Sequence, residues 1–385
     1  MASGRRMSPA RILIDLVPIR PGRGGTGSGI WTHARHLVDE LDQTDLVGLE
    51  VVVLVNPEQE EFFADLSRVK IRRFPGLGGS TMARLLWIHV VLPLVCLFLR
   101  ARALHKLATE TPFVCPARRI TTVHDFFGEF IREHTDHPTG PGARYFSWMT
   151  SVCFRKSRAV ITVSEAIRQE ALGRFPDTRA QVVAVHNGAD LPEADLPGDD
   201  GEFTVLCVAK FMPYKGQLEA LEAFDRLLRE RAELRGRARL VLHGFSNDEA
   251  YYDRVQQRQR EGLLNGHVEL RSYGKGKTVA DIYAGADAFL FLTMYEGFGL
   301  PVVESQALGI PVVASDIPVL REVGGEGACY VDRSDPQAVA EALYSIYADR
   351  TMRDRLIVLG RRNLERFGWD RMARETVSVY REACA

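Results

Sequence analysis

Residues 288–304 read AFLFLTMYEGFGLPVVE. The apolar run at 288–292 predicts a buried strand, Gly297 and Gly299 predict a turn, and the apolar positions from Val302 onward predict a helix. A strand that leads into a helix through a glycine-rich turn is the repeating unit of parallel sheets that are covered by helices on both faces. This stretch therefore predicts an α/β protein.

The same alternation of strands and helices extends in both directions from this stretch. In the second half we expect strands at 203–208, 240–242, 268–272, 288–292 and 311–314, and helices at 216–230, 279–284 and 302–308. In the first half we expect strands at 12–17, 51–55, 69–74, 120–123, 160–163 and 182–185, and helices at 30–41, 85–99 and 165–172. Two such series in tandem predict two Rossmann-like sheets facing across a cleft, with ligands bound outside the carboxyl ends of the strands.

The length of the chain also favours two domains, because 385 residues exceed the size at which a single core usually stops growing. Residues 187–201 are rich in glycine, proline and acidic side chains and lack apolar periodicity, which is typical of a linker. We therefore predict an N-terminal domain at 9–190, a linker at 191–201 and a C-terminal domain at 202–367.

The charge balance and the cysteines exclude several classes of protein. Lys and Arg number 49 against 50 Asp and Glu, a formal net charge of −1, which argues against broad nucleic-acid binding. The six cysteines are scattered without a Cys-x-x-Cys pair, so neither a zinc site nor a disulfide framework is indicated. Asp15 interrupts the first apolar run, which favours a strand over a signal peptide. We expect a cytoplasmic protein.

The apolar run from Leu85 to Leu99, interrupted only by His89, is the strongest candidate for membrane contact. As a helix it would span about 22 Å, which is short of a hydrocarbon core of about 30 Å. Two interpretations remain: a helix buried against a sheet, or a helix that docks at the inner face of a membrane with flanking arginines near anionic headgroups.

Two carboxylates, Glu296 and Glu304, flank the glycine turn that opens the helix. Backbone N–H groups of such a turn, together with the helix N-terminus, can hold phosphate oxygens, while carboxylates accept hydrogen bonds from ligand hydroxyls. This chemistry suits a sugar diphosphate. The alternative is an ordinary helix start in which a glutamate near the N-terminus interacts with the helix dipole, but it leaves the paired glycines unexplained.

Two cations follow the first strand of the second half, in the segment 209–216 that reads AKFMPYKG. Lys210 and Lys215 are predicted to reach one diphosphate from a strand-to-helix turn, where they would stabilise the negative charge that grows on a leaving pyrophosphate. The alternative is two solvated surface lysines.

Two further candidates lie in the first half. His124 ends the segment 121–124, which reads TTVH, and an imidazole there can donate or accept a hydrogen bond. A glycine-rich loop, 22–29, joins the first strand to the first helix; it matches Gly-x-Gly-x-x-Gly, but the second strand runs into Asn56 and Pro57 without the acidic residue that a dinucleotide site needs. A structural histidine and a plain flexible turn are the alternatives.

Residues 296–304, EGFGLPVVE, resemble residue for residue the Glu-x7-Glu hallmark of the retaining GT-B glycosyltransferases of family 4, the glycosyl transferases group 1. The resemblance implies that Glu296 binds hydroxyls of the donor sugar, that Glu304 binds the ribose, and that the backbone of Gly297, Phe298, Gly299 and Leu300 approaches the transferred sugar and diphosphate. Within that family the chain resembles bacterial polysaccharide mannosyl- and glucosyltransferases.

The resemblance extends over most of the chain. It implies that His124 lies beside the donor sugar and acceptor, and that the first loop contacts the acceptor or the leaving phosphate through Gly25, Thr26, Gly27, Ser28 and Gly29. It implies also that a C-terminal helix, 368–385, packs on the N-terminal, acceptor-binding domain. The family has Gly-Arg where this chain has Ala209-Lys210, so the first cation lacks the bidentate fork of arginine.

These observations predict a retaining transferase that moves a hexose of mannose or glucose type from a nucleoside-diphosphate sugar to a hydroxyl of a glycan or lipid-linked acceptor. His124, Lys215 and Glu296 are the predicted catalytic residues. No Asp-x-Asp occurs, so we expect no metal site and no cofactor beyond the donor. Two rivals stay open: a nucleotide-sugar epimerase of similar fold, and a non-catalytic scaffold at a membrane. The nucleotide, the sugar, the acceptor and the oligomeric state are not encoded in these motifs.

Overall fold

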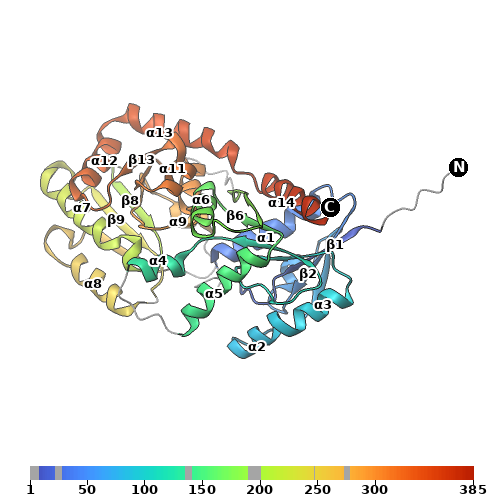
Figure 1. The fold of residues 1–385 in the computed structure, drawn as a ribbon. Coiled ribbons are helices and arrows are strands. Elements are labelled where there is room, and N and C mark those ends of the chain that lie inside the picture. Colours follow the sequence, from blue (N-terminus) through green and yellow to red (C-terminus); the bar gives the residue numbers. More distant parts are fainter. Residues whose placement is uncertain (1–7, 22–27, 135–140, 190–200, 247, 273–277) are drawn as a thin grey trace. The chain divides into compact units, whose positions relative to one another are not determined.

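The computed structural model describes residues 8–385 with gaps at 22–27, 135–140, 190–200, 247 and 273–277 (Figure 1). The chain divides into two compact units, residues 1–188 with 368–385, and residues 189–367. Of the predicted linker, 191–201, only Gly201 is among the described residues. The C-terminal segment therefore belongs to the same unit as the N-terminal half.

The first unit contains, in its described residues, a parallel sheet of seven strands in the order β3-β2-β1-β4-β5-β6-β7. The strands are β1 (Ala10–Asp15), β2 (Leu49–Val55), β3 (Lys70–Arg73), β4 (Ala103–Lys106), β5 (Arg118–Val123), β6 (Ala159–Thr162) and β7 (Gln181–Ala184). Its main helices are α1 (Ser28–Gln43), α2 (Thr81–Leu86), α3 (Leu92–Phe98), α4 (Phe127–His134), α5 (Pro141–Lys156), α6 (Glu165–Arg174) and α14 (Trp369–Cys384). In Figure 1 α14 lies beside α1.

The centre of this sheet holds charged and polar groups that pair with one another. Lys106, at the end of β4, forms a buried ion pair with Asp15, at the end of β1. His105 lies between two hydroxyls, at 2.7 Å from Tyr380 Oη and 2.8 Å from Thr122 Oγ1. Because Tyr380 belongs to α14, this contact ties the end of the chain to the middle of the first sheet.

The second unit contains a parallel sheet of six strands, among the residues described, in the order β10-β9-β8-β11-β12-β13. The strands are β8 (Phe203–Val208), β9 (Ala238–His243), β10 (Val268–Arg271), β11 (Ala288–Phe291), β12 (Val312–Ser315) and β13 (Ala328–Val331). The helices are α7 (Gln217–Glu230), α8 (Glu249–Gln259), α9 (Val279–Tyr283), α10 (Leu300–Ala307), α11 (Pro318–Gly324), α12 (Pro336–Ala348) and α13 (Arg350–Asn363).

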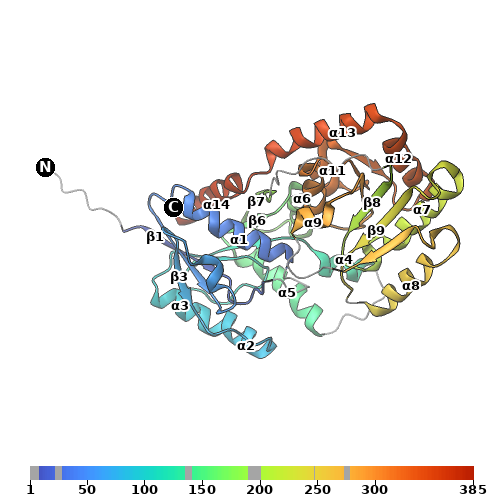
Figure 2. The ribbon, with the colours of Figure 1, turned by 180° about the vertical axis from the view of Figure 1, so that it is seen from behind.

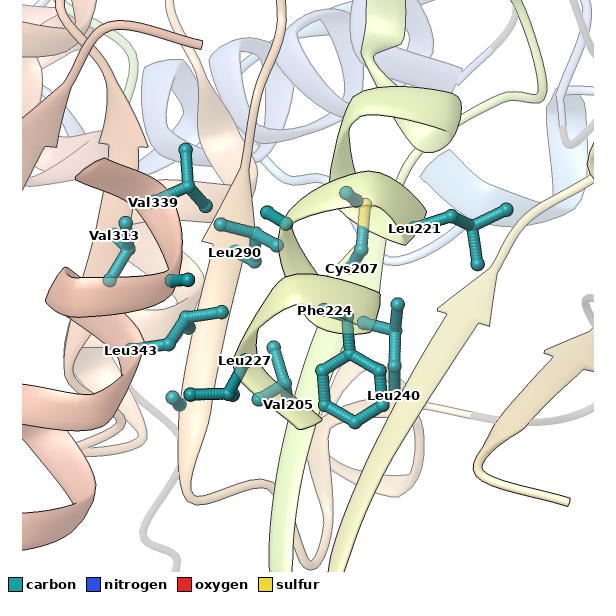
Figure 3. Close-up of a cluster of buried hydrophobic side chains, with 14 of the residues drawn as sticks. Val205, Cys207, Leu221, Phe224, Leu227, Leu240, Leu290, Val313, Val339 and Leu343 are labelled. Carbon is teal, nitrogen blue, oxygen red and sulfur yellow. The ribbon is translucent and has the colours of Figure 1, made fainter. Parts of the chain in front are cut away.

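Helices α7 and α12 close one face of the second sheet. Figure 3 shows Phe224 and Leu227 of α7 packed against Val205 of β8 and Leu240 of β9. All four side chains are at most 1% exposed. The strands are buried because helices cover the sheet, which explains why they read as continuous apolar runs in the sequence.

The predicted strands and helices all correspond to observed elements, with ends that differ by a few residues. Strands β4 and β13 and helices α4, α5, α8, α11, α12 and α13 were not predicted. Ser164 caps α6 as an N-cap should, since its hydroxyl accepts a hydrogen bond from the Ile167 N–H at 3.2 Å.

The interpretation of 85–99 as a helix buried against a sheet is correct for its packing on the sheet but wrong for its burial, because most of the helix is not buried. Residues 81–98 form one helical rod, α2 and α3 joined by a π turn at Trp87–Val91, and 22% of it is buried. Trp87, Ile88 and Leu92 pack on the sheet, while Leu94 and Phe98 are exposed. Among the described residues this rod alone is long and apolar enough to cross a membrane, by length and composition.

Candidate functional site in the second unit

The strand order of the second sheet contains one switch point, between β8 and β11. From β8 the chain proceeds to β9 and β10 on one side, and from β11 to β12 and β13 on the other. Connections that diverge in this way leave a crevice outside the carboxyl ends of the two central strands, where α/β proteins bind ligands. The predicted donor residues follow these two strands: Lys210 and Lys215 follow β8, and Glu296 follows β11.

The two loops at this crevice are joined through the backbone of Tyr214. Its carbonyl accepts a hydrogen bond from the Met294 N–H at 2.7 Å and another from Thr293 Oγ1 at 3.3 Å. Gly216 has φ +77°, and a Cβ at this position would collide with the carbonyl of Leu292. Glycine is therefore required for the β8 loop to lie against the end of β11.

Lys215 and Glu296 are brought into direct contact. The Lys215 ammonium donates to Glu296 Oε1, and their side chains are 12% and 19% exposed. The ammonium also lies 4.9 Å from the centre of the Tyr214 ring and 5.7 Å from that of Phe291. A cation held by a carboxylate and two aromatic faces is partly desolvated, so it can interact strongly with an anionic ligand that enters the crevice.

Lys210 is placed differently from Lys215. Its ammonium lies 5.2 Å from the centre of the Phe245 ring, and its carbonyl accepts a hydrogen bond from Gln217 Nε2 at 2.7 Å. The backbone of the loop is thus fixed at this point. The prediction that both lysines contact one diphosphate stays a prediction.

The turn Gly297–Leu300 leads directly into α10. Gly299 is the N-cap with φ +96°, and a Cβ there would lie 2.8 Å from Leu320 Cδ2. A glycine N-cap supplies no side chain to accept hydrogen bonds from the first turn, which leaves that turn suited to an anion. Phe298 is 4% exposed and packs edge-on against Phe367, so only its backbone is available to a ligand.

Glu304 lies one turn into α10 and is oriented by a residue that the motifs did not reveal. The hydroxyl of Tyr283, in α9, donates to Glu304 Oε2 at 2.8 Å. Arg333 was also missed: its Nε donates to the Leu292 carbonyl at 3.0 Å, and its other nitrogen pairs with Glu219. Neither residue has a spacing relation to the motif, so the sequence offered no signal for either of them.

His124 follows β5 in the first unit. Its Nε2–H donates to the Leu107 carbonyl at 3.2 Å, since a carbonyl can only accept. Burial lowers the pKa of His124 well below its ordinary value, and the neighbouring His33 lowers it further. The imidazole is therefore neutral at physiological pH, and its Nδ1 carries a lone pair that can accept a proton or a hydrogen bond.

His33, in α1, supports His124 and was not predicted as a site residue. The two rings meet edge to face with centroids 4.9 Å apart. His33 Nδ1 donates to Asn187 Oδ1 at 2.7 Å, while its Nε2 is buried without a hydrogen-bond partner among the described residues. The first loop cannot be compared in the same way, because Gly25, Thr26 and Gly27 lie outside the described residues; Ser28 and Gly29 begin α1.

The buried histidines predict a pH dependence of stability in the first unit. Burial lowers the pKa of His33 to about 4 and that of His105 to about 3. In the unfolded chain a histidine has a pKa near 6.5. The free energy of unfolding is therefore unaffected by these histidines above that pH, and it decreases as the pH falls from about 6.5 toward the lower pKa values of the folded state. At pH 5 each histidine is expected to cost about 2 kcal/mol of unfolding free energy.

Urea unfolding at pH 7.5 and pH 5.0 measures this dependence. The variant His33→Gln should show a smaller difference between the two pH values than the wild type. Equal stability at both pH values, or a gain at pH 5.0, would contradict buried neutral histidines.

Among the described residues, no group of three or more His, Cys, Asp or Glu side chains is arranged to hold a metal ion. The expectation that the reaction needs no metal stays a prediction. The six cysteines are free thiols, of which Cys96, Cys153 and Cys207 are buried.

Comparison with known proteins gives matches over nearly the whole chain. Residues 193–363 match the family described as glycosyl transferases group 1, and residues 27–193 match glycosyltransferase family 4. The chain is 25% identical over 277 residues to the O-antigen chain mannosyltransferase B of Escherichia coli, covering 69% of this chain and 70% of that protein. It is 30% identical to a D-inositol 3-phosphate glycosyltransferase of Kineococcus radiotolerans, over 58% of this chain and 57% of that one.

Solved structures show the same fold. An Anabaena HepE protein in complex with UDP and glucose superposes with a TM-score of 0.72 at 14% identity, covering 97% of this chain and 100% of that chain. WaaG, a glycosyltransferase involved in lipopolysaccharide biosynthesis, superposes with a TM-score of 0.71 at 11% identity, covering 96% and 99%. Both the sequence matches and the fold agree with the motif at 296–304.

Proposed function

Because the chain belongs to the glycosyl transferases group 1 family and has the GT-B fold, we propose that it is a retaining hexosyltransferase that uses a nucleoside-diphosphate sugar. The acceptor would be a hydroxyl of a glycan or of a lipid-linked sugar. A mannose- or glucose-type donor is supported by the mannosyltransferase among the relatives and by the UDP and glucose in the HepE structure.

The observation that carries the proposal is the contact between Lys215 and Glu296 at the switch point of the second sheet. A diphosphate that enters the crevice would take over the Lys215 ammonium, because two phosphate charges attract it more strongly than one carboxylate does. Glu296 would then accept hydrogen bonds from the sugar hydroxyls. One binding event would thus order both ends of the donor.

The proposed mechanism uses Lys215 to stabilise the leaving group. Negative charge accumulates on the β-phosphate as the bond to the sugar breaks, and a fixed ammonium binds that charge more tightly in the transition state than in the ground state. The departing phosphate would accept the acceptor's proton on the face from which it leaves, which gives retention without a dedicated side-chain base. For His124 we propose a hydrogen bond to substrate through Nδ1.

Glu304 and Tyr283 are proposed to bind the ribose of the donor. Replacing Glu304 by Ala should raise the KM for the donor about 10- to 100-fold with a small change in kcat, because a hydrogen bond to a charged group contributes about 1.5–3 kcal/mol. Tyr283→Phe should raise the KM by less. This substitution removes the 2.8 Å hydrogen bond to Glu304 but leaves the Glu304 carboxylate in place. A KM that is unchanged in Glu304→Ala would contradict the assignment.

The proposed location is the cytoplasm, with a peripheral contact at the inner face of the membrane. The buried free thiols suit a reducing compartment, and a lipid-linked acceptor would place the reaction at a membrane surface. Nothing in the charge balance favours nucleic acid as a partner.

The test of the proposed function is a donor panel. Purified protein is incubated with UDP-, GDP- and ADP-sugars in EDTA, with and without a glycan-lipid extract, and the anomeric configuration of the product is read by NMR. We expect release of the nucleoside diphosphate and a glycosidic linkage with the same anomeric configuration as the donor sugar. An inverted linkage would refute retention, and conversion of the donor to another free sugar nucleotide would identify an epimerase.

A further inference from the structure

The helical rod 81–98 carries an exposed apolar stripe on the side that faces away from its sheet. The six side chains of this stripe are between 48% and 86% exposed: Met82, Leu86, Val90, Leu94, Leu97 and Phe98. Successive members are mostly four residues apart, so they line one side of a helix. A patch of this extent is unusual on a soluble monomer and marks a surface for docking.

The π turn at Trp87–Val91 keeps the stripe in line. A step of four residues slightly exceeds one α-helical turn of 3.6 residues, so a stripe with this spacing would wind around a regular helix. The wider π turn accommodates the excess in the middle of the rod. Figure 2 shows α2 and α3 following one another along this side of the first unit.

The buried side of the rod excludes a membrane-spanning role. Trp87 Nε1 donates to both carboxylate oxygens of Asp15 at 3.2 Å, and Ile88, Leu92 and Cys96 pack with Leu13 and Leu104 of the sheet. Crossing a bilayer would break these contacts and expose the Asp15–Lys106 ion pair to hydrocarbon. The contacts of the buried side therefore leave only the exposed stripe available to a partner surface.

A cluster of aromatic side chains extends the stripe sideways. Phe113 stacks on His89 with centroids 4.0 Å apart, and Trp148 of α5 lies 5.0 Å from Phe113. Val114 and Trp148 are 77% and 49% exposed. Tryptophan and phenylalanine are the side chains that settle at the boundary between headgroups and acyl chains.

The charge around the stripe indicates which surface it meets. Residues 66–109 contain no Asp or Glu but eight Lys or Arg, in a chain whose net charge is −1. Four of these cations are ion-paired: Lys70, Arg73, Arg84 and Lys106. The other four are exposed arginines, Arg68, Arg72, Arg100 and Arg102, of which Arg102 donates to the Cys384 carbonyl. A segment that contains the apolar stripe and carries this excess of positive charge suits an anionic lipid surface, whereas a second copy of the chain would bring the same positive charge against itself.

We propose that the apolar stripe, with Phe113, Val114 and Trp148, inserts into the headgroup region of an anionic bilayer while the exposed arginines bind lipid headgroups. This inference deepens the location given under the proposed function and rests on that location, not on the transfer reaction. It makes the first unit the membrane-bound unit, so that an acceptor carried by a lipid would be recruited by diffusion in the membrane plane.

The test is flotation with vesicles of phosphatidylcholine containing 30% phosphatidylglycerol, or none. The wild type should float with the anionic vesicles, and binding should fall with added salt. Leu94→Glu/Phe98→Glu should reduce the partition coefficient at least tenfold, and Arg72→Gln/Arg100→Gln should reduce it on anionic vesicles. Val47→Glu, at a 78% exposed apolar position elsewhere in the same unit, is the matched control and should float as the wild type does.

Unchanged flotation of Leu94→Glu/Phe98→Glu would overturn the proposal. So would a wild type that stays with the soluble fraction and forms a dimer that this variant abolishes, since the stripe would then be an interface between copies. Melting temperatures and nucleoside-diphosphate binding of each variant are measured in parallel. A variant that no longer floats but still binds nucleotide shows that the stripe acts in membrane docking alone. A wild type that floats but binds no nucleotide would refute the proposed transferase function and leave the docking proposal standing.

Discussion

Replacement of Lys215 by Ala is expected to lower kcat/KM for the donor about 100- to 1,000-fold, which is the range found when one preorganised electrostatic group is removed from an active site. Lys215 is 12% exposed, contacts Glu296 and lies against two aromatic rings, so water cannot replace it fully. Most of the loss should appear in kcat, because the charge on the leaving phosphate is greatest in the transition state.

Steady-state kinetics of Lys215→Ala, Lys215→Arg and Lys210→Ala distinguish the effect of the positive charge itself from the effect of its position in the loop. Lys215→Arg keeps the charge and should recover part of the rate. Lys210→Ala removes a cation from the same loop, but one that lies over Phe245 instead of Glu296, and should cost less. A decrease of less than threefold in Lys215→Ala, under about 1 kcal/mol of transition-state stabilisation, would contradict the proposed role.

Gly216→Ala is expected to destabilise the second unit by about 3–5 kcal/mol or to prevent its folding, which exceeds the range for most single substitutions. Two effects combine at this position. An alanine at φ +77° is strained by about 1–2 kcal/mol, and its Cβ would collide with the carbonyl of Leu292, which Arg333 also holds by a hydrogen bond. Relief of the collision would separate the β8 loop from β11 and move Lys215 away from Glu296.

Gly285→Ala provides the control for backbone strain alone. Gly285 has φ +76° in the same unit, and a Cβ there would meet nothing within 4 Å. Urea unfolding should therefore show about 1–2 kcal/mol of destabilisation for Gly285→Ala and a clearly larger loss for Gly216→Ala. Equal losses in the two variants would show that the close approach to Leu292 has no energetic importance.

The second sheet, and the positions of the candidate site residues on it, were largely predictable because the informative residues are close together in the sequence. The run 288–304 contains a strand, a turn and a helix, and β8, which precedes the loop that carries Lys215, has the apolar character of a buried parallel strand. What the sequence could not provide is that Lys215 and Glu296, 81 residues apart, contact each other. Such a contact depends on β8 and β11 being neighbours, which is a property of the strand order.

Strand β4 shows the opposite case. It reads ALHK, and two polar residues in four argue against a buried central strand. In the folded chain both are satisfied by distant partners, Lys106 by Asp15 and His105 by Tyr380 and Thr122. The burial of the rod 81–98 was mispredicted for a related reason. Composition shows that the helix is apolar all round, but which of its sides is covered depends on how the rest of the chain packs against it.

Binding of nucleoside diphosphates in the absence of metal tests the central claim most directly. UDP, GDP and ADP are each added in EDTA to the wild type and to Lys215→Ala, and unfolding is followed by denaturant or heat. One of them, at a hundred times its dissociation constant, should stabilise the wild type by about 2.7 kcal/mol, and Lys215→Ala should lose most of that gain at the same concentration. No stabilisation by any of the three, or a gain that Lys215→Ala keeps in full, would contradict a diphosphate site at Lys215 and Glu296.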